Sequence, residues 1–163
     1  MRAAIVNSGL RFPGQRVTVN LAPAAIRKTG SIYDLPIAVA ILTATEQIPS
    51  AALEAALIVG ELPLDGSTRQ VSGVLPMAAM ARPEEFSVFY VSSVDAPEAA
   101  LLPGLTVIPV ERLVDLVHHF NGLTTLSPHT NSVDLQDEPD TGADFTYVKG
   151  QEHVKRALEV AAA

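Results

Sequence analysis

Strand-like and helix-like segments alternate along the chain from Arg16 to Gly122, and this alternation restricts the folds that the sequence can adopt. The segment "RVTVNL" alternates polar and β-branched residues, which is typical of a strand. The apolar segments "LIVGELPL", "SVFYVS" and "LTVIPV" are typical of strands that are mostly buried. Helical patterns lie between them. The alternation predicts an α/β domain, with Asp65-Gly66 turning one hairpin within its sheet.

The helical patterns also carry start and stop signals. Asp34 is predicted to cap a helix, "LPIAVAILTATEQ", that is apolar on nearly every face and is therefore expected to be central and buried. Ser50 is predicted to cap a shorter helix, "AALEAA". The amphipathic pattern in "VERLVDLVHHFNG" predicts a last helix that stops at Gly122.

The composition changes after Gly122, where Thr, Ser, Pro, Asn and acidic residues dominate for about 20 residues, longer than a loop within a compact domain. The sequence therefore predicts a domain in residues 1–122, a flexible acidic linker in 123–143 and a separate helical segment in 144–163. We expect that helix to be loosely packed or docked on a neighbour, because nothing in the chain is obviously meant to cover its apolar face. That face is formed by Val154, Ala157, Leu158 and Ala161.

The composition excludes several classes of protein. The 163 residues contain no cysteine, which excludes a disulfide scaffold, a Cys-ligated zinc site and a Cys nucleophile, and fits a reducing cytosol. The apolar run "LPIAVAIL" is far shorter than the ~20 residues that cross a bilayer. His118 and His119 point about 100° apart on a helix, so they do not form a metal site. We expect a cytoplasmic protein with no metal ligands.

The charges are distributed unevenly. The net charge of −7 argues against a uniformly basic nucleic-acid binder. No acidic residue precedes Asp34, however, and that region contains five cations. They are Arg2, Arg11, Arg16, Arg27 and Lys28. Two interpretations stay open: a solvated basic edge, or a basic face directed at phosphate groups in an assembly.

The segment "RKTGSIYDLP" gathers cations and hydroxyls ahead of a predicted helix. A helix N-terminus attracts anions, yet Asp34 is expected to fill the cap, so a capped loop and an anion site are both open interpretations. Ser31 and Lys28 are close in sequence, but a Ser/Lys hydrolase needs them within ~3 Å of each other. Hydroxyls in Gly-rich loops are more often turn-formers.

Three segments together resemble one family. "NSGLRFPGQRVTVNLAPAAIRKTGSIYDLPIAVAIL", "GELPLDGSTRQVSGVLPMA" and "DFTYVKGQEHVKRALEVAAA" are similar to the ComM/YifB family of magnesium-chelatase-like AAA+ ATPases. The resemblance implies a cytosolic hexamer that remodels branched DNA during competence. It also implies an N-terminal domain with the Lon-protease-like fold, a two-layer α/β sandwich with a mixed sheet, whose first strands precede Met1.

The resemblance also bears on catalysis. Alignment with the two Lon motifs places Ile32 where the nucleophilic Ser belongs and Leu75 where the Lys belongs, while Ser31 falls one position early. The resemblance therefore implies no catalytic residue and no peptidase activity in this domain. Two alternatives stay open: a Ser/Lys peptidase domain of an ATP-dependent protease, and a protein-interaction or oligomerisation module without DNA contact.

The resemblance assigns binding residues as well. In the family, the segment "VKGQEHVKRALEVAAA" leads into the ATP-binding P-loop, which puts Val148, Gly150 and Gln151 near the adenine. ATP and Mg²⁺ are expected for the intact protein and no cofactor for this fragment, because the phosphate-binding glycines and lysine are missing. Single-stranded or branched DNA is the expected partner, with Arg27 and Lys28 as candidate contacts.

Overall fold

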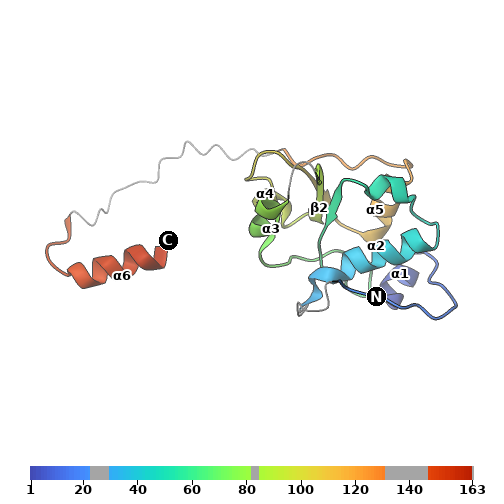
Figure 1. Cartoon of the computed structure of the whole chain (residues 1–163), viewed down its shortest axis with the longest axis horizontal. Coiled ribbons are helices and arrows are strands. Elements are labelled where there is room, and N and C mark those ends of the chain that lie inside the picture. Colours follow the sequence, from blue (N-terminus) through green and yellow to red (C-terminus); the bar gives the residue numbers. More distant parts are fainter. Residues whose placement is uncertain (23–29, 82–84, 131–146, 163) are drawn as a thin grey trace. The chain divides into compact units, whose positions relative to one another are not determined.

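The computed structural model of the chain describes residues 1–22, 30–81, 85–130 and 147–162 (Figure 1). The chain forms two compact units, Met1–Asn131 and Ser132–Ala163, and each is described by itself. The elements of the first unit follow one another in chain order. They are α1 (Arg2–Asn7), the 3-10 helix η1 (Ser31–Tyr33), α2 (Asp34–Ala44), the 3-10 helix η2 (Ser50–Leu53), β1 (Ala56–Ile58), α3 (Val74–Met80), β2 (Val88–Ser92), α4 (Ala96–Ala99), β3 (Thr106–Val110) and α5 (Leu113–Phe120).

The sheet of the first unit has three strands in the order β1-β2-β3, and both pairings are parallel. In its register, Tyr90 of β2 pairs with Ile58 on one side and Ile108 on the other. Helix α3 connects β1 to β2 and helix α4 connects β2 to β3, as parallel strands require. The predicted α/β class is confirmed.

Helices pack on both faces of this sheet, since residues of opposite parity on β2 join two different apolar clusters. Tyr90 packs with α1, α2 and α5 in the first cluster. Phe89 and Val91 pack with α3 and α4 in the second. The alternation of side chains along a strand produces this division. The described residues therefore form three layers, whereas the resemblance implied two.

The predicted turn at Asp65-Gly66 forms and the chain returns antiparallel, but among the described residues this hairpin does not join the sheet. Asp65 and Gly66 do turn the chain, and the Gly66 N–H donates to the Pro63 carbonyl over 3.1 Å. The two sides of the turn meet only in an isolated antiparallel bridge between Glu61 and Arg69, outside the named strands.

Helix α2 forms as predicted, but its start differs. Asp34 is its first residue and not its cap, because the 3-10 turn of Ser31–Tyr33 continues directly into the helix. The backbone takes the role of the cap, and the Leu35 N–H donates to the Gly60 carbonyl over 3.0 Å. The carboxylate of Asp34 remains in the first turn, where an acid favours the helix dipole.

Ser50 is not a cap either. It is the first residue of the 3-10 helix η2, which follows Pro49 and has no side-chain cap. The Pro49 carbonyl accepts the Ala52 N–H over 3.1 Å, so a backbone turn replaces the predicted cap. The predicted "AALEAA" helix is correspondingly reduced to one short turn that ends before β1.

The residues directly after Gly122 lie against the first unit. The Leu126 N–H donates to Nδ1 of His119 over 3.2 Å, and the Leu126 side chain packs against the first apolar cluster. The His129 N–H donates to the Val107 carbonyl over 2.8 Å. These contacts place the described residues 123–130 with the domain, although the sequence pattern assigned them to the linker.

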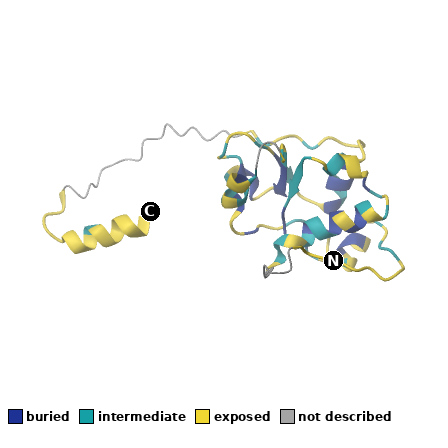
Figure 2. Ribbon diagram, viewed as in Figure 1, coloured by how far each residue is buried: buried dark blue, intermediate teal, exposed yellow. Residues whose placement is uncertain are grey.

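In the second unit, α6 (Glu152–Ala162) is the described helix. None of its described residues is buried, and Val154 and Leu158 on its apolar face are 43% and 49% exposed (Figure 2). Its charged face carries ion pairs one turn apart, between Lys155 and Glu152 and between Arg156 and Glu159. No helix among the described residues is long and apolar enough to cross a membrane.

Candidate functional site

The candidate site begins where the chain leaves α1 and passes beside α2. Leu10 and Phe12 pack against the first apolar cluster. The side chain of Gln47 fixes the chain between them, because it accepts the Arg11 N–H over 2.9 Å and donates to the Arg11 carbonyl over 2.7 Å. The guanidinium of Arg2 lies 5.7 Å from the centre of the Phe12 ring. This end of the segment is therefore held firmly.

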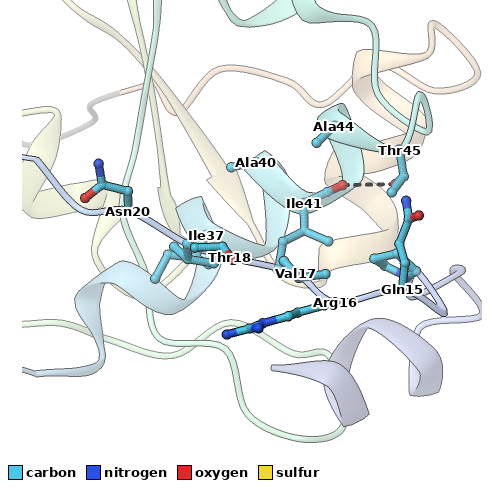
Figure 3. Close-up of a pocket in the computed structure, with 12 residues that line it drawn as sticks. Gln15, Arg16, Val17, Thr18, Asn20, Ile37, Ala40, Ile41, Ala44 and Thr45 are labelled. Carbon is cyan, nitrogen blue, oxygen red and sulfur yellow. Dashed lines mark hydrogen bonds between the residues drawn. The ribbon is translucent and has the colours of Figure 1, made fainter.

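Beyond this attachment the segment forms one wall of a cavity of about 340 Å³, and α2 forms the other (Figure 3). We call this cavity the α2 groove. Figure 3 shows Val17 directed toward Ile41 of α2, and the Thr45 hydroxyl donating to the Ile41 carbonyl over 2.9 Å. The residues that line the groove are Pro13, Gln15, Arg16, Val17, Thr18, Val19, Asn20, Ile37, Ala40, Ile41, Ala44 and Thr45.

The predicted strand at Arg16–Leu21 is wrong, because the structure assigns no strand there. Among the described residues, no backbone hydrogen bond joins residues 16–20 to a neighbouring segment. A β-strand is defined by its pairing, so an alternating sequence without a partner remains an unpaired segment. The side chains of Val17 and Val19 are 37% and 48% exposed.

The groove contains a cation and no acid. Arg16 is exposed, and Figure 3 shows its side chain on the side of the segment away from Ile41. No Asp or Glu lines the groove, and only its wall of residues 13–20 belongs to the acid-free stretch before Asp34. The predicted DNA-contact residues Arg27 and Lys28 continue this stretch but lie outside the described residues.

A second cavity, of about 520 Å³, is lined by η1, Glu61 and residues 70–72, and it bears on the peptidase alternative. The Ser31 hydroxyl donates to a carboxylate oxygen of Glu61, whose other oxygen lies 3.9 Å from Nη1 of Arg69. The residues that line the cavity are Gly30, Ser31, Ile32, Tyr33, Glu61, Gln70, Val71, Ser72 and Met77. The described part of this cavity contains no lysine, and Lys28 lies outside the described residues.

Ile32 and Leu75, which align with the two catalytic positions of Lon, both contact residues of the domain interior or of α4. Ile32 packs against the second apolar cluster. The Leu75 N–H donates to Oε1 of Glu98 over 3.2 Å. Sequence reasoning did not identify the bond between Ser31 and Glu61, because the two residues are 30 positions apart and neither belongs to a recognisable spacing.

One buried carboxylate is bonded to a residue that lines this second cavity. Asp95 is 1% exposed, and its Oδ2 accepts the Val71 N–H over 3.1 Å. Its Oδ1 has no hydrogen-bond partner among the described residues. Burial raises the pKa of the Asp95 carboxyl above its ordinary value of 3.8. In the turn, by contrast, hydrogen bonds from the hydroxyl and N–H of Ser67 lower the pKa of Asp65.

The residues assigned to the adenine site lie at the start of α6. Val148, Gly150 and Gln151 are exposed, and Gly150 and Gln151 both have positive φ angles, of 75° and 58°. The Gln151 carbonyl accepts the N–H groups of Val154 and Lys155, which begins the helix. Across the described residues, no group of three His, Asp or Glu side chains is placed to hold a metal ion.

Comparison with known proteins identifies the class. A family model described as subunit ChlI of Mg-chelatase matches residues 1–95. Over the whole chain, an uncharacterised protein of Mycobacterium tuberculosis is 39% identical, the competence protein ComM of Haemophilus influenzae 37% and the uncharacterised protein YifB of Escherichia coli 35%. The chain belongs to the ComM/YifB family of Mg-chelatase-like proteins. It spans 32% of the length of each of these relatives.

Proposed function

We propose that this chain is the N-terminal part of a ComM-type AAA+ ATPase and that its first unit handles DNA without catalysing a reaction. The proposal extends to the intact protein as a cytoplasmic hexamer that remodels single-stranded or branched DNA. The observation that carries it is the charge distribution. In a chain of net charge −7, the stretch before Asp34 contains five cations and no acid.

The ATPase part of the proposal concerns the longer protein. The segment from Val148 to Gln151 is suited at most to the adenine side of a nucleotide site. The sequence contains no G-x-x-x-x-G-K-[ST] motif, whose backbone N–H groups and lysine bind the phosphates. We therefore assign phosphate and Mg²⁺ binding to residues beyond this chain and no ATP chemistry to the 163 residues themselves.

The contacts of Ser31 support a non-catalytic first unit. Its hydroxyl donates to Glu61 and not to a lysine among the described residues, and the positions that align with the Lon dyad are the apolar residues Ile32 and Leu75. Arg69 instead pairs with Glu61 and balances its charge. This arrangement connects η1 to the segment of Glu61 and Arg69, which is a structural role.

DNA binding by the longer protein tests the proposal. Dissociation constants for single-stranded and forked DNA are measured by fluorescence anisotropy over a series of salt concentrations. The double variant Arg27→Ala/Lys28→Ala should weaken binding and reduce the slope of log K against log salt by about 0.9 for each lost duplex phosphate contact, or about 0.7 on single strands.

Arg69→Ala provides a matched control. Its side chain is 67% exposed and lies outside the acid-free stretch, so this variant loses one positive charge without touching the proposed surface. We expect its salt slope to equal that of the unchanged protein. An unchanged slope in the Arg27/Lys28 variant, or no DNA binding by the intact protein, would refute the DNA role of the first unit.

A further inference from the structure

The inference concerns the described segment after α5, residues 123–130, and the histidine that binds it. His119 is half-buried near the end of α5 and packs beside two aromatic rings, Tyr90 of β2 and Phe120 of α5. The centres of the Tyr90 and His119 rings are 5.7 Å apart, and the Tyr90 and Phe120 side chains are both buried. This packing fixes the orientation of the His119 ring.

The two nitrogens of the His119 ring have different partners. The Leu126 N–H donates to Nδ1 over 3.2 Å, so Nδ1 is the acceptor and carries no hydrogen. A neutral imidazole has its one ring proton on the other nitrogen, and Nε2 lies 3.2 Å from the Tyr90 hydroxyl oxygen. Nε2 therefore donates to Tyr90. The backbone of Leu126 thus selects one neutral tautomer of His119.

We propose that His119 is a pH-sensitive switch, whose neutral ring holds residues 123–130 on the first unit and whose protonated ring releases them. An imidazolium that has taken a proton from water carries a hydrogen on both nitrogens, so its Nδ1–H faces the Leu126 N–H and neither group accepts. Attachment of the segment therefore favours the neutral ring, and by linkage a falling pH favours release.

The other bond of the ring does not change. Nε2 donates to the Tyr90 hydroxyl in both the neutral and the protonated form of His119. Burial raises the pKa of Tyr90 above its ordinary value of 10.0, so the phenol keeps its proton throughout the range in which a histidine titrates. Protonation therefore acts on the segment and leaves the contact with β2 in place.

The charged groups around His119 permit this response. Among the described residues, no carboxylate forms an ion pair with the ring and holds it in the charged form. Asp115 lies one turn earlier on α5, where an acid favours protonation, and His118 is the adjacent titratable residue. In the segment itself, His129 is bonded to the Val107 carbonyl through its backbone N–H, so its ring takes no part in that bond.

Release is expected to be partial. The Leu126 side chain packs against the first apolar cluster, and this contact does not depend on the charge of His119. The bond from the His129 N–H to the Val107 carbonyl is independent of it as well. Protonation therefore removes one of several contacts and shifts the balance between the attached and the released segment, with the largest change at Leu126.

Hydrogen exchange of the 163-residue chain at about pH 8 and about pH 5, the range in which histidines titrate, tests the proposal. Each rate is divided by the intrinsic rate at the same pH to give a protection factor. The protection factor of the Leu126 amide should fall about 10-fold at the lower pH, which is the effect of losing one hydrogen bond. The amides of β2 are the internal reference. An unchanged factor at Leu126, or an equal fall in β2, would overturn the inference.

Two variants assign the effect to His119. His119→Asn places an amide oxygen near the position of Nδ1 and removes the titrating group, so its Leu126 protection factor should be equal at the two pH values. His118→Asn is the matched control, because His118 is the adjacent half-buried histidine and is not the partner of Leu126. A fall that persists in His119→Asn, or that disappears in His118→Asn, would contradict the assignment and overturn the inference.

The ring nitrogens provide a test on the unchanged chain, which does not depend on how well a variant folds. Their ¹⁵N chemical shifts at about pH 8 should show Nε2 protonated and Nδ1 unprotonated in His119. A proton on Nδ1 at that pH would overturn the inference, because Nδ1 would then be unable to accept the Leu126 N–H. None of these measurements contains DNA, so their outcome is independent of the proposed DNA binding.

Discussion

At the residue scale, Gly66 is the position where backbone conformation and close packing coincide. Its φ is +78°, and a Cβ placed there would lie 2.1 Å from the Ser8 hydroxyl and 3.4 Å from the Ala4 carbonyl oxygen. Ser8 itself donates to that carbonyl over 2.8 Å. The turn after Pro63 thus packs against the end of α1, and only glycine satisfies both requirements.

Gly66→Ala should lower the free energy of unfolding by about 1–2 kcal/mol from the left-handed backbone alone, and further from displacing the Ser8 side chain. Ser8→Ala should cost about 1 kcal/mol for its lost hydrogen bond. In the double variant the displacement disappears, so its loss should be smaller than the sum of the two single losses. Urea unfolding of the unchanged protein, the two single variants and the double variant measures these free energies. Strict additivity of the two losses would show that Gly66 and Ser8 are not in contact.

At the element scale, α4 holds the chain that enters α3. Asp95, directly before α4, accepts the Val71 N–H, and Glu98 within α4 accepts the Leu75 N–H. Because α3 and α4 cover the same face of the sheet, these two bonds fix their relative positions. One oxygen of the buried Asp95 carboxylate has no hydrogen-bond partner among the described residues.

Asp95→Asn should stabilise the protein at neutral pH. The amide oxygen still accepts the Val71 N–H, and the charge that burial disfavours is gone. Burial raises the pKa of Asp95 in the folded protein above the unfolded value of 3.8. Above that folded pKa the carboxyl is ionised and destabilises the folded protein. Below pH 3.8 it is protonated in both states, and this destabilisation is absent. The gain in urea midpoint should therefore be present at pH 7 and absent near pH 3.5.

Glu111→Gln is the control, because Glu111 is exposed and its change should leave the midpoint unaltered at pH 7. If Asp95→Asn instead destabilised the protein at pH 7, the ionised carboxylate would be needed to hold the entry to α3.

The sequence pattern predicted most of the elements of the first unit. The strands β2 and β3 and the helices α2 and α5 follow from apolar runs and helical spacing, and their main positions agree with the structure. Pattern failed where a partner decides the conformation. Residues 16–20 have the alternating sequence of a strand but no paired strand among the described residues. Asp34 and Ser50 do not cap their helices, because backbone turns precede them and take that role.

At the scale of the whole molecule, the chain consists of two units of unequal packing. All buried described residues lie between Ala4 and Phe120. In residues 123–130, the last described hydrogen bond to the rest of the first unit runs from the His129 N–H to the Val107 carbonyl. The domain that packs around the sheet therefore includes residues up to about 130, and α6 contributes no buried residue to any core.

Truncation tests this division. A chain ending at Thr130 should unfold at the same urea concentration as the 163-residue chain, because it retains every buried described residue. A chain ending at Gly122 should unfold at a lower concentration, since it loses the packing of Leu126 and the hydrogen bonds of Leu126 and His129. Equal midpoints for the two truncated chains would show that residues 123–130 contribute nothing to the domain.

The sequence by itself determined the family, the α/β class, the positions of the packed strands and helices, and the lack of a P-loop within these residues. All of these depend on local spacing or on short motifs. The tertiary structure alone decided that Ser31 binds Glu61, that residues 123–130 lie on the domain and that α2 leaves an open groove. Each of these depends on contacts between distant parts of the chain, whose relative positions are set by packing around the sheet and leave no local signal.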